Sequence, residues 1–143
     1  MHFLFFDKNK HFPRQMDFLC SKKLRIMTNK IYYLASCDTC RKIIKTLPKN
    51  ANLVFRDIKQ DPISPEELDE MVRLSGSYEA LFSKKAILYK TLDLKNKNLT
   101  ETDYKNYILE HYTFLSRPVF IIDNKIFIGN SQPVTLQVMK ALS

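Results

Sequence analysis

The segment Cys37-Asp38-Thr39-Cys40 constrains the fold of this chain more than any other stretch. The residues before it, 31–35, are a short apolar run rich in β-branched and aromatic side chains, which is typical of a strand. After it, residues 40, 43, 44 and 47 follow the spacing of one helix face, and Pro48 ends the pattern. A strand, a Cys-x-x-Cys turn and a helix in this order indicate a redox site.

The two cysteines occupy different places in the predicted helix. Cys37 lies at or just before the helix start, where free N–H groups and the positive end of the helix dipole favour a thiolate. Asp38 opposes this effect, so we expect a moderate lowering of the Cys37 pKa. Cys40 points inward with the apolar face. We therefore expect Cys40 to be a buried thiol, and mild oxidation to join Cys37 to Cys40 and leave Cys20 out.

Length and composition predict a single soluble domain. The chain has 143 residues, of which 45% are hydrophobic, with 10 Phe and 7 Tyr to fill a core. Its apolar runs fall well short of the roughly 20 residues of a membrane span, and the run at residues 3–6 is too short for a signal peptide. We expect a cytoplasmic monomer. In that compartment a Cys-x-x-Cys pair is usually reactive or metal-binding rather than a structural disulfide.

The pattern of cysteines and histidines does not favour a metal site. Structural zinc needs four ligands, and the ones left beside the Cys-x-x-Cys pair form no second paired motif. These are Cys20, His2, His11 and His111. We expect neither a metal nor a bound cofactor.

The formal charge of +8 is concentrated at the N-terminus. Residues 1–26 carry six Lys and Arg against two Asp, half of the net charge, and show no sustained periodicity. We expect them to be either a disordered basic extension or a stretch upstream of the true start at Met27, and we favour the second. The domain would then span residues 27–143, and residues 1–26 would be dispensable for stability. The mildly basic remainder suits an anionic substrate, and no aromatic–basic alternation indicates direct nucleic-acid binding.

The central part of the chain predicts a βαβ unit and then helices. Residues 52–58 alternate as a second strand, parallel to the first because a single helix connects them. The segment 64–67 (Ser-Pro-Glu-Glu) is a capping box with proline at the first helical position, and Gly76 ends that helix. Residues 77–99 show only short helical pieces. A second capping motif at 100–103 opens a helix whose apolar face ends at His111, and we assign His111 to that face rather than to catalysis.

The C-terminal part predicts a hairpin and a helix. The apolar run after Pro118, residues 119–122, is a central-looking strand, and 126–128 forms its antiparallel partner after a turn at 123–125. A last helix opens at Gln132. The whole order is β-α-β, a block of helices, then β-β-α.

This order, with Cys-x-x-Cys after the first strand and Arg117-Pro118 before the third, resembles a thioredoxin-like three-layer α/β fold. The resemblance implies a mixed four-stranded sheet with an inserted helical block. More closely, the chain resembles the arsenate reductase family that also contains the Spx-type transcription regulators. Four segments, in this order and spacing, carry the resemblance: 31–47, 78–89, 99–110 and 115–129.

The resemblance also implies roles for individual residues. Cys37 would be the nucleophile on arsenate, and Arg117 would bind the anion or stabilise the thiolate, as suits a planar, permanently charged guanidinium. Pro118 would be a cis-proline facing the cysteines. Glutathione with glutaredoxin, thioredoxin, or Cys40 would supply the electrons that resolve the adduct.

The sequence departs from the glutaredoxin-linked enzymes of this family at two arginine positions. Ser83 and Lys84 stand at one, and Gly129 and Asn130 at the other. Arg41 and Lys84 are our candidates for partial substitutes in substrate binding. Two alternatives to an arsenate reductase stay open: a redox-switched, Spx-like regulator that binds RNA polymerase, and a general thiol–disulfide oxidoreductase.

Overall fold

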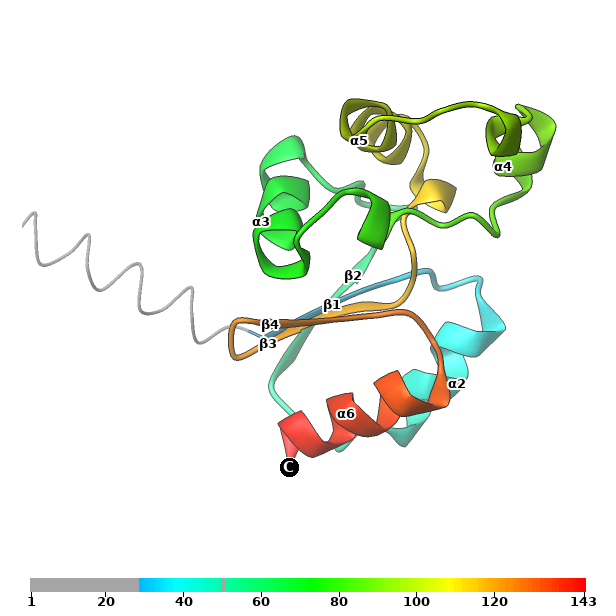
Figure 1. Cartoon of the computed structure of the whole chain (residues 1–143). Helices are drawn as coiled ribbons and strands as arrows, with labels where there is room; N and C mark the ends of the chain where they lie inside the picture. The colour runs from blue at the N-terminus through cyan, green and yellow to red at the C-terminus, as the bar shows by residue number, and fades with distance from the viewer. Residues whose placement is uncertain (1–28, 50) are drawn as a thin grey trace, which may run out of the picture.

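The computed structural model describes residues 29–49 and 51–143 (Figure 1). The expected extension 1–26 and the expected start at Met27 therefore lie outside the described residues. The first part of the domain contains β1, α2 and β2, and the last part contains β3, β4 and α6. Their bounds are Asn29–Tyr33, Asp38–Thr46, Leu53–Asp57, Val119–Ile122, Lys125–Ile128 and Gln132–Leu142.

The inserted helical block lies between these two parts. It holds the α-helices α3, α4 and α5 and three short 3-10 turns, η2, η3 and η4. The α-helices span Pro65–Ser75, Ile87–Thr91 and Glu101–Glu110, and the turns span Glu79–Leu81, Leu94–Asn96 and Tyr112–Phe114. No helix of the described ranges is both long and apolar enough to cross a membrane.

The strands of the described chain form one four-stranded mixed sheet in the order β2-β1-β3-β4. β1 is parallel to β2 and antiparallel to β3, and β3 and β4 form the hairpin. Asp123 and Asn124, with φ of 50° and 63°, make a two-residue turn, and a turn with two positive φ values matches the right-handed twist of the flanking strands. The predicted turn was one residue too long, because Lys125 already pairs with Ile122.

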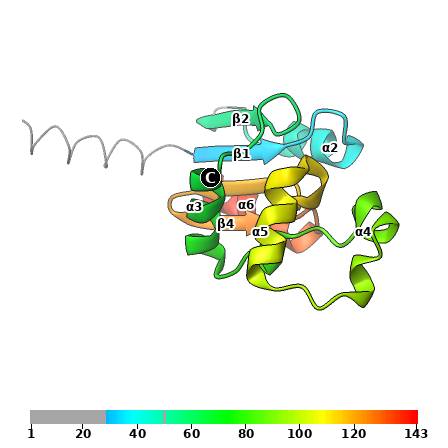
Figure 2. The ribbon, with the colours of Figure 1, turned by 90° about the horizontal axis from the view of Figure 1, so that it is seen from above.

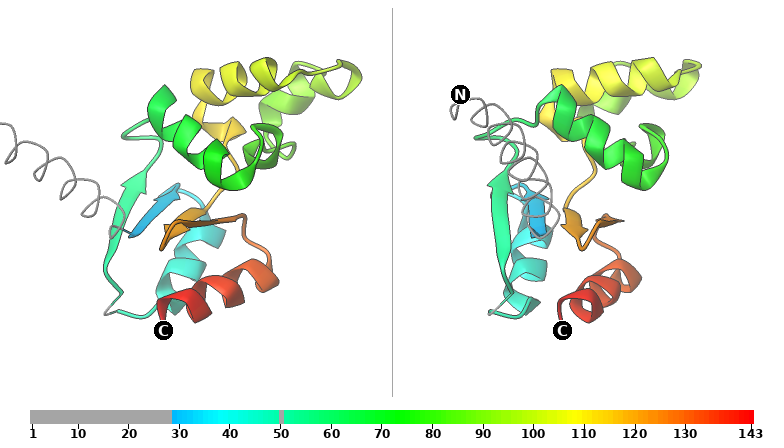
Figure 3. Two further views of the ribbon diagram at one scale, coloured as in Figure 1. Left: turned by 60° about the vertical axis from the view of Figure 1, so that its left-hand side comes forward. Right: turned by 90° about the vertical axis from the view of Figure 1, so that its left-hand side faces the viewer.

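Helices cover both faces of the sheet and produce three layers (Figures 1 and 3). α2 and α6 lie on one face, where Ile31 of β1 packs in a cluster with Ile43 and Val138. The helical block lies on the other face, where the next residue, Tyr32, packs in a cluster with Leu68. Successive side chains of a strand point to opposite faces, so each inner strand serves both cores. The predicted thioredoxin-like α/β architecture is confirmed.

The helix ends follow local sequence signals. The capping box predicted at the start of α3 is present, with Ser64 accepting from the Glu67 N–H, and Gly76 ends this helix at φ 98°. The second box is present at α5, where Thr100 accepts from the Asp103 N–H. Each cap satisfies N–H groups that a helix start leaves unpaired.

One short backbone bridge ties the helical block to the approach to β3. Phe82 pairs with Leu115 in an antiparallel bridge, and its ring stacks on Phe114 with centroids 5.2 Å apart. The Ser83 N–H donates to the carbonyl of Phe114 at 2.7 Å, and the Ser116 N–H to that of Leu81 at 2.8 Å. This bridge brings residues 83–85 beside residues 116–117. Seen from above, α4 lies at the outer end of the block, away from the sheet (Figure 2).

Candidate functional site

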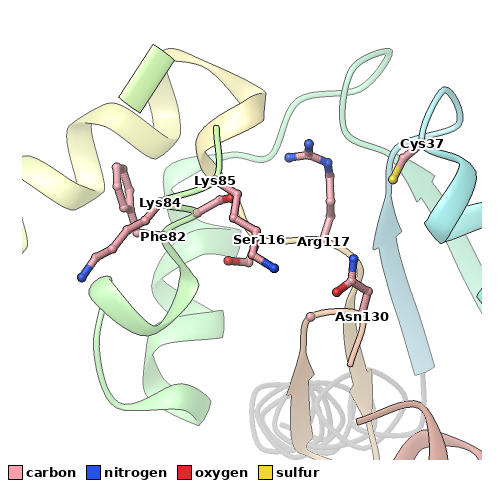
Figure 4. Close-up of a pocket in the computed structure, with 9 residues that line it drawn as sticks. Cys37, Phe82, Lys84, Lys85, Ser116, Arg117 and Asn130 are labelled. Atoms are coloured by element: carbon pink, nitrogen blue, oxygen red, sulfur yellow. The ribbon is translucent and has the colours of Figure 1, made fainter. Parts of the chain in front are cut away.

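Cys37 lines a pocket of about 330 Å3 that four separate segments build (Figure 4). The start of α2 supplies the cysteine. The two segments that the Phe82–Leu115 bridge joins supply residues 82–85 and 116–117, and the loop from β4 to α6 supplies residues 129–130. The other lining residues are Phe82, Ser83, Lys84, Lys85, Ser116, Arg117, Gly129 and Asn130. Among the described residues, the lining has three cationic side chains and no carboxylate.

Cys37 is the N-cap residue of α2. Partial burial alone would raise the pKa of this thiol. Hydrogen bonds from Cys40 and from the Thr39 N–H, together with the Arg117 guanidinium, outweigh burial and lower the pKa below its ordinary value. The direction is the one expected for a thiol at a helix start.

Cys40 lies one helical turn further on and is fully buried. Burial raises its pKa to about 11, and the neighbouring Cys37 sulfur adds to the rise. Both cysteines are free thiols. Cys40 is therefore protonated at neutral pH and acts on Cys37 as a hydrogen-bond donor.

Arg117 is held in place by main-chain carbonyls, and one of its buried donor atoms has no partner among the described residues. Its Nη1 donates to the carbonyls of Thr113 at 3.1 Å and Leu115 at 3.4 Å. Its Nε is buried and has no hydrogen-bond partner within the described part of the chain. A buried N–H without an acceptor is costly, so this donor suits an anionic ligand or a thiolate.

The peptide bond between Arg117 and Pro118 is cis, as the family resemblance implied. Pro118 does not line the pocket, but its carbonyl accepts the Gly129 N–H at 2.9 Å. Gly129 has φ of 100°, a backbone conformation that favours glycine. This contact brings the next residue, Asn130, to the pocket beside Arg117.

The other two predicted binding residues have ion-pair partners of their own. Lys84 lines the pocket, but its Nζ contacts Glu79 at 3.1 Å, and its side chain points away from Cys37 in Figure 4. Arg41 is outside the lining and pairs with Asp38 on the exposed side of α2.

Sequence reasoning did not single out Lys85 or Ser116, and it treated Asn130 only as a missing arginine. All three line the pocket, and the Asn130 amide points into the space between Arg117 and Cys37 in Figure 4. The adjacency of Ser116 to Arg117 was the one available signal. No group of three or more His, Cys, Asp or Glu that could hold a metal ion comes together among residues 29–49 and 51–143.

Comparison with known proteins places this site in a family. The family model described as the ArsC family matches residues 32–137, a range that contains both Cys37 and Arg117. The chain belongs to the ArsC family. It is thus related to two kinds of protein, regulators and reductases.

Relatives of both kinds are about a quarter identical to this ArsC-family chain over the aligned residues. The global transcriptional regulator Spx 1 of Bacillus cereus is 26% identical over 71% of this chain and 79% of its own length. An arsenate reductase of Haemophilus influenzae is 26% identical over 76% of this chain and 97% of its own. The solved structure of an arsenate reductase from Vibrio cholerae has a TM-score of 0.63 at 25% identity, covering 81% of this chain and 98% of that one.

Proposed function

We propose that this ArsC-family protein is a thiol-dependent oxidoreductase that reduces arsenate, with Cys37 as the nucleophile. The observation that carries the proposal is one pocket that holds a thiol of lowered pKa together with Arg117, whose Nε–H lacks an acceptor in the described chain. A thiolate and an arsenate anion repel each other, so a fixed cation between them must offset the repulsion as they approach.

In the first step the Cys37 thiolate attacks the arsenic atom. A sulfur–arsenic bond forms, and one arsenate oxygen takes up protons and leaves as water. The N–H groups at the start of α2 and the Arg117 guanidinium bind the remaining oxygens. Asn130 and Ser116 offer further neutral donors in the same pocket.

In the second step another thiol attacks the Cys37 sulfur. The electron pair of the sulfur–arsenic bond stays on arsenic, which becomes As(III), and a disulfide forms. Because the pKa of Cys40 is raised to about 11, little of it is thiolate at neutral pH, which favours glutathione as the attacking thiol. Glutaredoxin, or thioredoxin if Cys40 attacks, then reduces the disulfide.

A second candidate is a redox-switched regulator that binds RNA polymerase. Two observations favour it: the similarity to Spx 1, and the engagement of Lys84 by Glu79 at one of the family's arginine positions. In this case a Cys37–Cys40 disulfide would change the affinity for the partner. A general thiol–disulfide oxidoreductase would use the same two cysteines without arsenate.

An NADPH oxidation assay with glutathione and glutaredoxin tests the proposal on the full chain. We expect arsenate-dependent turnover that Cys37→Ser abolishes and Cys40→Ser leaves largely intact. Arg117→Ala should lower the rate by about 10²–10³, as loss of a preorganised donor does at other oxyanion sites. Turnover no higher than that of Cys37→Ser would reject the reductase. Retention of RNA polymerase subunits by the oxidised but not the reduced protein would then support the regulator.

A further inference from the structure

His111 lies outside the pocket, yet its ring nitrogen contacts the segment that holds Arg117. This histidine follows α5 and starts η4. Its Nδ1 accepts the Thr113 N–H at 3.3 Å and lies 2.7 Å from the Thr113 hydroxyl. The side chain of His111 thus caps the η4 turn by accepting the Thr113 N–H.

Thr113, whose N–H the histidine accepts, is also the residue whose carbonyl binds Arg117. The Arg117 Nη1 donates to the Thr113 carbonyl at 3.1 Å and to the Leu115 carbonyl at 3.4 Å. The bridge to the helical block fixes the segment on its other side, through the bond from the Ser83 N–H to the Phe114 carbonyl at 2.7 Å. Residues 113–115 thus form a carbonyl cradle between two supports, and His111 is one of them.

We propose that His111 is a positioning residue for Arg117: its Nδ1 fixes the Thr113 turn and thereby the carbonyl cradle that holds the guanidinium in the Cys37 pocket. The histidine is not among the residues that line the pocket, so we give it no part in proton transfer at the reacting atoms. The inference rests on the proposed roles of Cys37 and Arg117.

Two substitutions separate the two things that this side chain does. The ring stacks on Tyr112 with centroids 4.7 Å apart, and Nδ1 accepts the bonds from Thr113. His111→Phe keeps an aromatic ring for the stack and removes the acceptor. His111→Asn removes the ring and keeps an acceptor close to the position of Nδ1. If the stack alone mattered, the phenylalanine variant would be the milder change.

The readout is the rate at which iodoacetamide alkylates Cys37, measured against pH and located by mass spectrometry. It requires no arsenate turnover, so it stays informative if the protein proves not to be a reductase. In His111→Phe we expect the Cys37 titration to move to higher pH. The rate at pH 7 should fall about three- to tenfold, because one pKa unit is a tenfold change in the thiolate fraction. His111→Asn should stay within about twofold of the unchanged protein, well inside one pKa unit.

A double-substitution cycle tests the route through the arginine. In an Arg117→Ala background, His111→Phe should have no further effect on the Cys37 rate. Thr113→Val removes the hydroxyl that contacts Nδ1, and it should also lower the alkylation rate of Cys37. It replaces His111→Phe in the test if that variant does not fold. An unchanged rate in these variants would overturn the proposal. So would equal losses in His111→Phe and His111→Asn, or a loss that persists without Arg117.

Discussion

Cys37 and Cys40 lie within one turn of α2, and their environments move their pKa values in opposite directions. Hydrogen bonds at the helix start lower the pKa of Cys37, whereas burial raises that of Cys40 to about 11. The proposed nucleophile therefore differs from the other cysteine by its position along the helix rather than by residue type. The outward sulfur has the lower pKa, and the inward sulfur supports its ionised form as a hydrogen-bond donor.

This difference predicts selective labelling of the reduced protein. Iodoacetamide at pH 7 should modify Cys37 at least about tenfold faster than Cys40, since a difference of more than one pKa unit changes the thiolate fraction by more than tenfold. Peptide mapping by mass spectrometry against time measures both rates in one sample. The Cys37→Ser variant is the control, because Cys40 should stay slow in it. Faster modification of Cys40 would reverse the assignment of the nucleophile.

At the scale of the elements, the cap of α3 also connects that helix to the sheet. The Ser64 Oγ accepts the Glu67 N–H at 3.2 Å, and the Glu67 carboxylate accepts the Ser64 N–H at 2.9 Å. The same carboxylate pairs with Arg56 on β2. A short-range sequence signal thus also fixes where the helical block attaches to the edge of the sheet.

Removal of the cap should therefore destabilise the domain and leave the thiol unaffected. We expect Ser64→Ala to lower the free energy of unfolding by about 1 kcal/mol, a typical value for a lost N-cap. Ser64→Asp keeps a side-chain acceptor, so its loss should be clearly smaller. Urea unfolding followed by circular dichroism measures both. Equal losses in the two variants would show that the Ser64 side-chain bond contributes little.

At the scale of the whole molecule, the sequence predicted those structural features that depend only on residues close together in the chain. Both capping boxes, the parallel β1–β2 pair and the hairpin are set by short patterns, and all are present. The short helical pieces of residues 77–99 could not be bounded, because helices of three to five residues have little stability of their own. Tertiary contacts hold them instead, such as Phe82 packed against Tyr89, Tyr104 and Phe114.

The candidate site shows the same division. The chain position of Cys37 follows from the strand–helix pattern, but the identity of its neighbours depends on the Phe82–Leu115 bridge, which joins segments some 30 residues apart. Periodicity carries no information on that pairing. Nor does it show that Lys84 points to Glu79, since an ion pair of exposed side chains outside a helix has no fixed spacing and is weak.

Two weak acids are buried in the core, the Cys40 thiol and the Tyr32 phenol, and their burial predicts how the stability of the domain depends on pH. Burial raises the pKa of Cys40 to about 11, and burial, with nearby glutamates, raises that of Tyr32 to about 12. In the unfolded chain these groups titrate near their ordinary values of about 8.5 and 10. Above pH 8.5 the unfolded chain therefore loses protons that the folded protein keeps, so stability falls as pH rises. The lowered pKa of Cys37 has the opposite effect, because its contribution to stability is lost as pH falls and the thiolate takes up a proton. This loss occurs below about pH 8.5 and does not change the alkaline slope.

We expect the free energy of unfolding to fall continuously between about pH 8.5 and pH 11, with a slope of at most about 1.4 kcal/mol per pH unit for each group. Urea unfolding in the presence of a reductant, at a series of pH values, measures this slope. Cys40→Ala should flatten it from about pH 8.5 upward, and Tyr32→Phe, which keeps the ring, only above about pH 10, because each variant removes one of the two titrations. If all three proteins lost stability in parallel, the alkaline slope would have to come from other groups, and the buried thiol and phenol would not be its source.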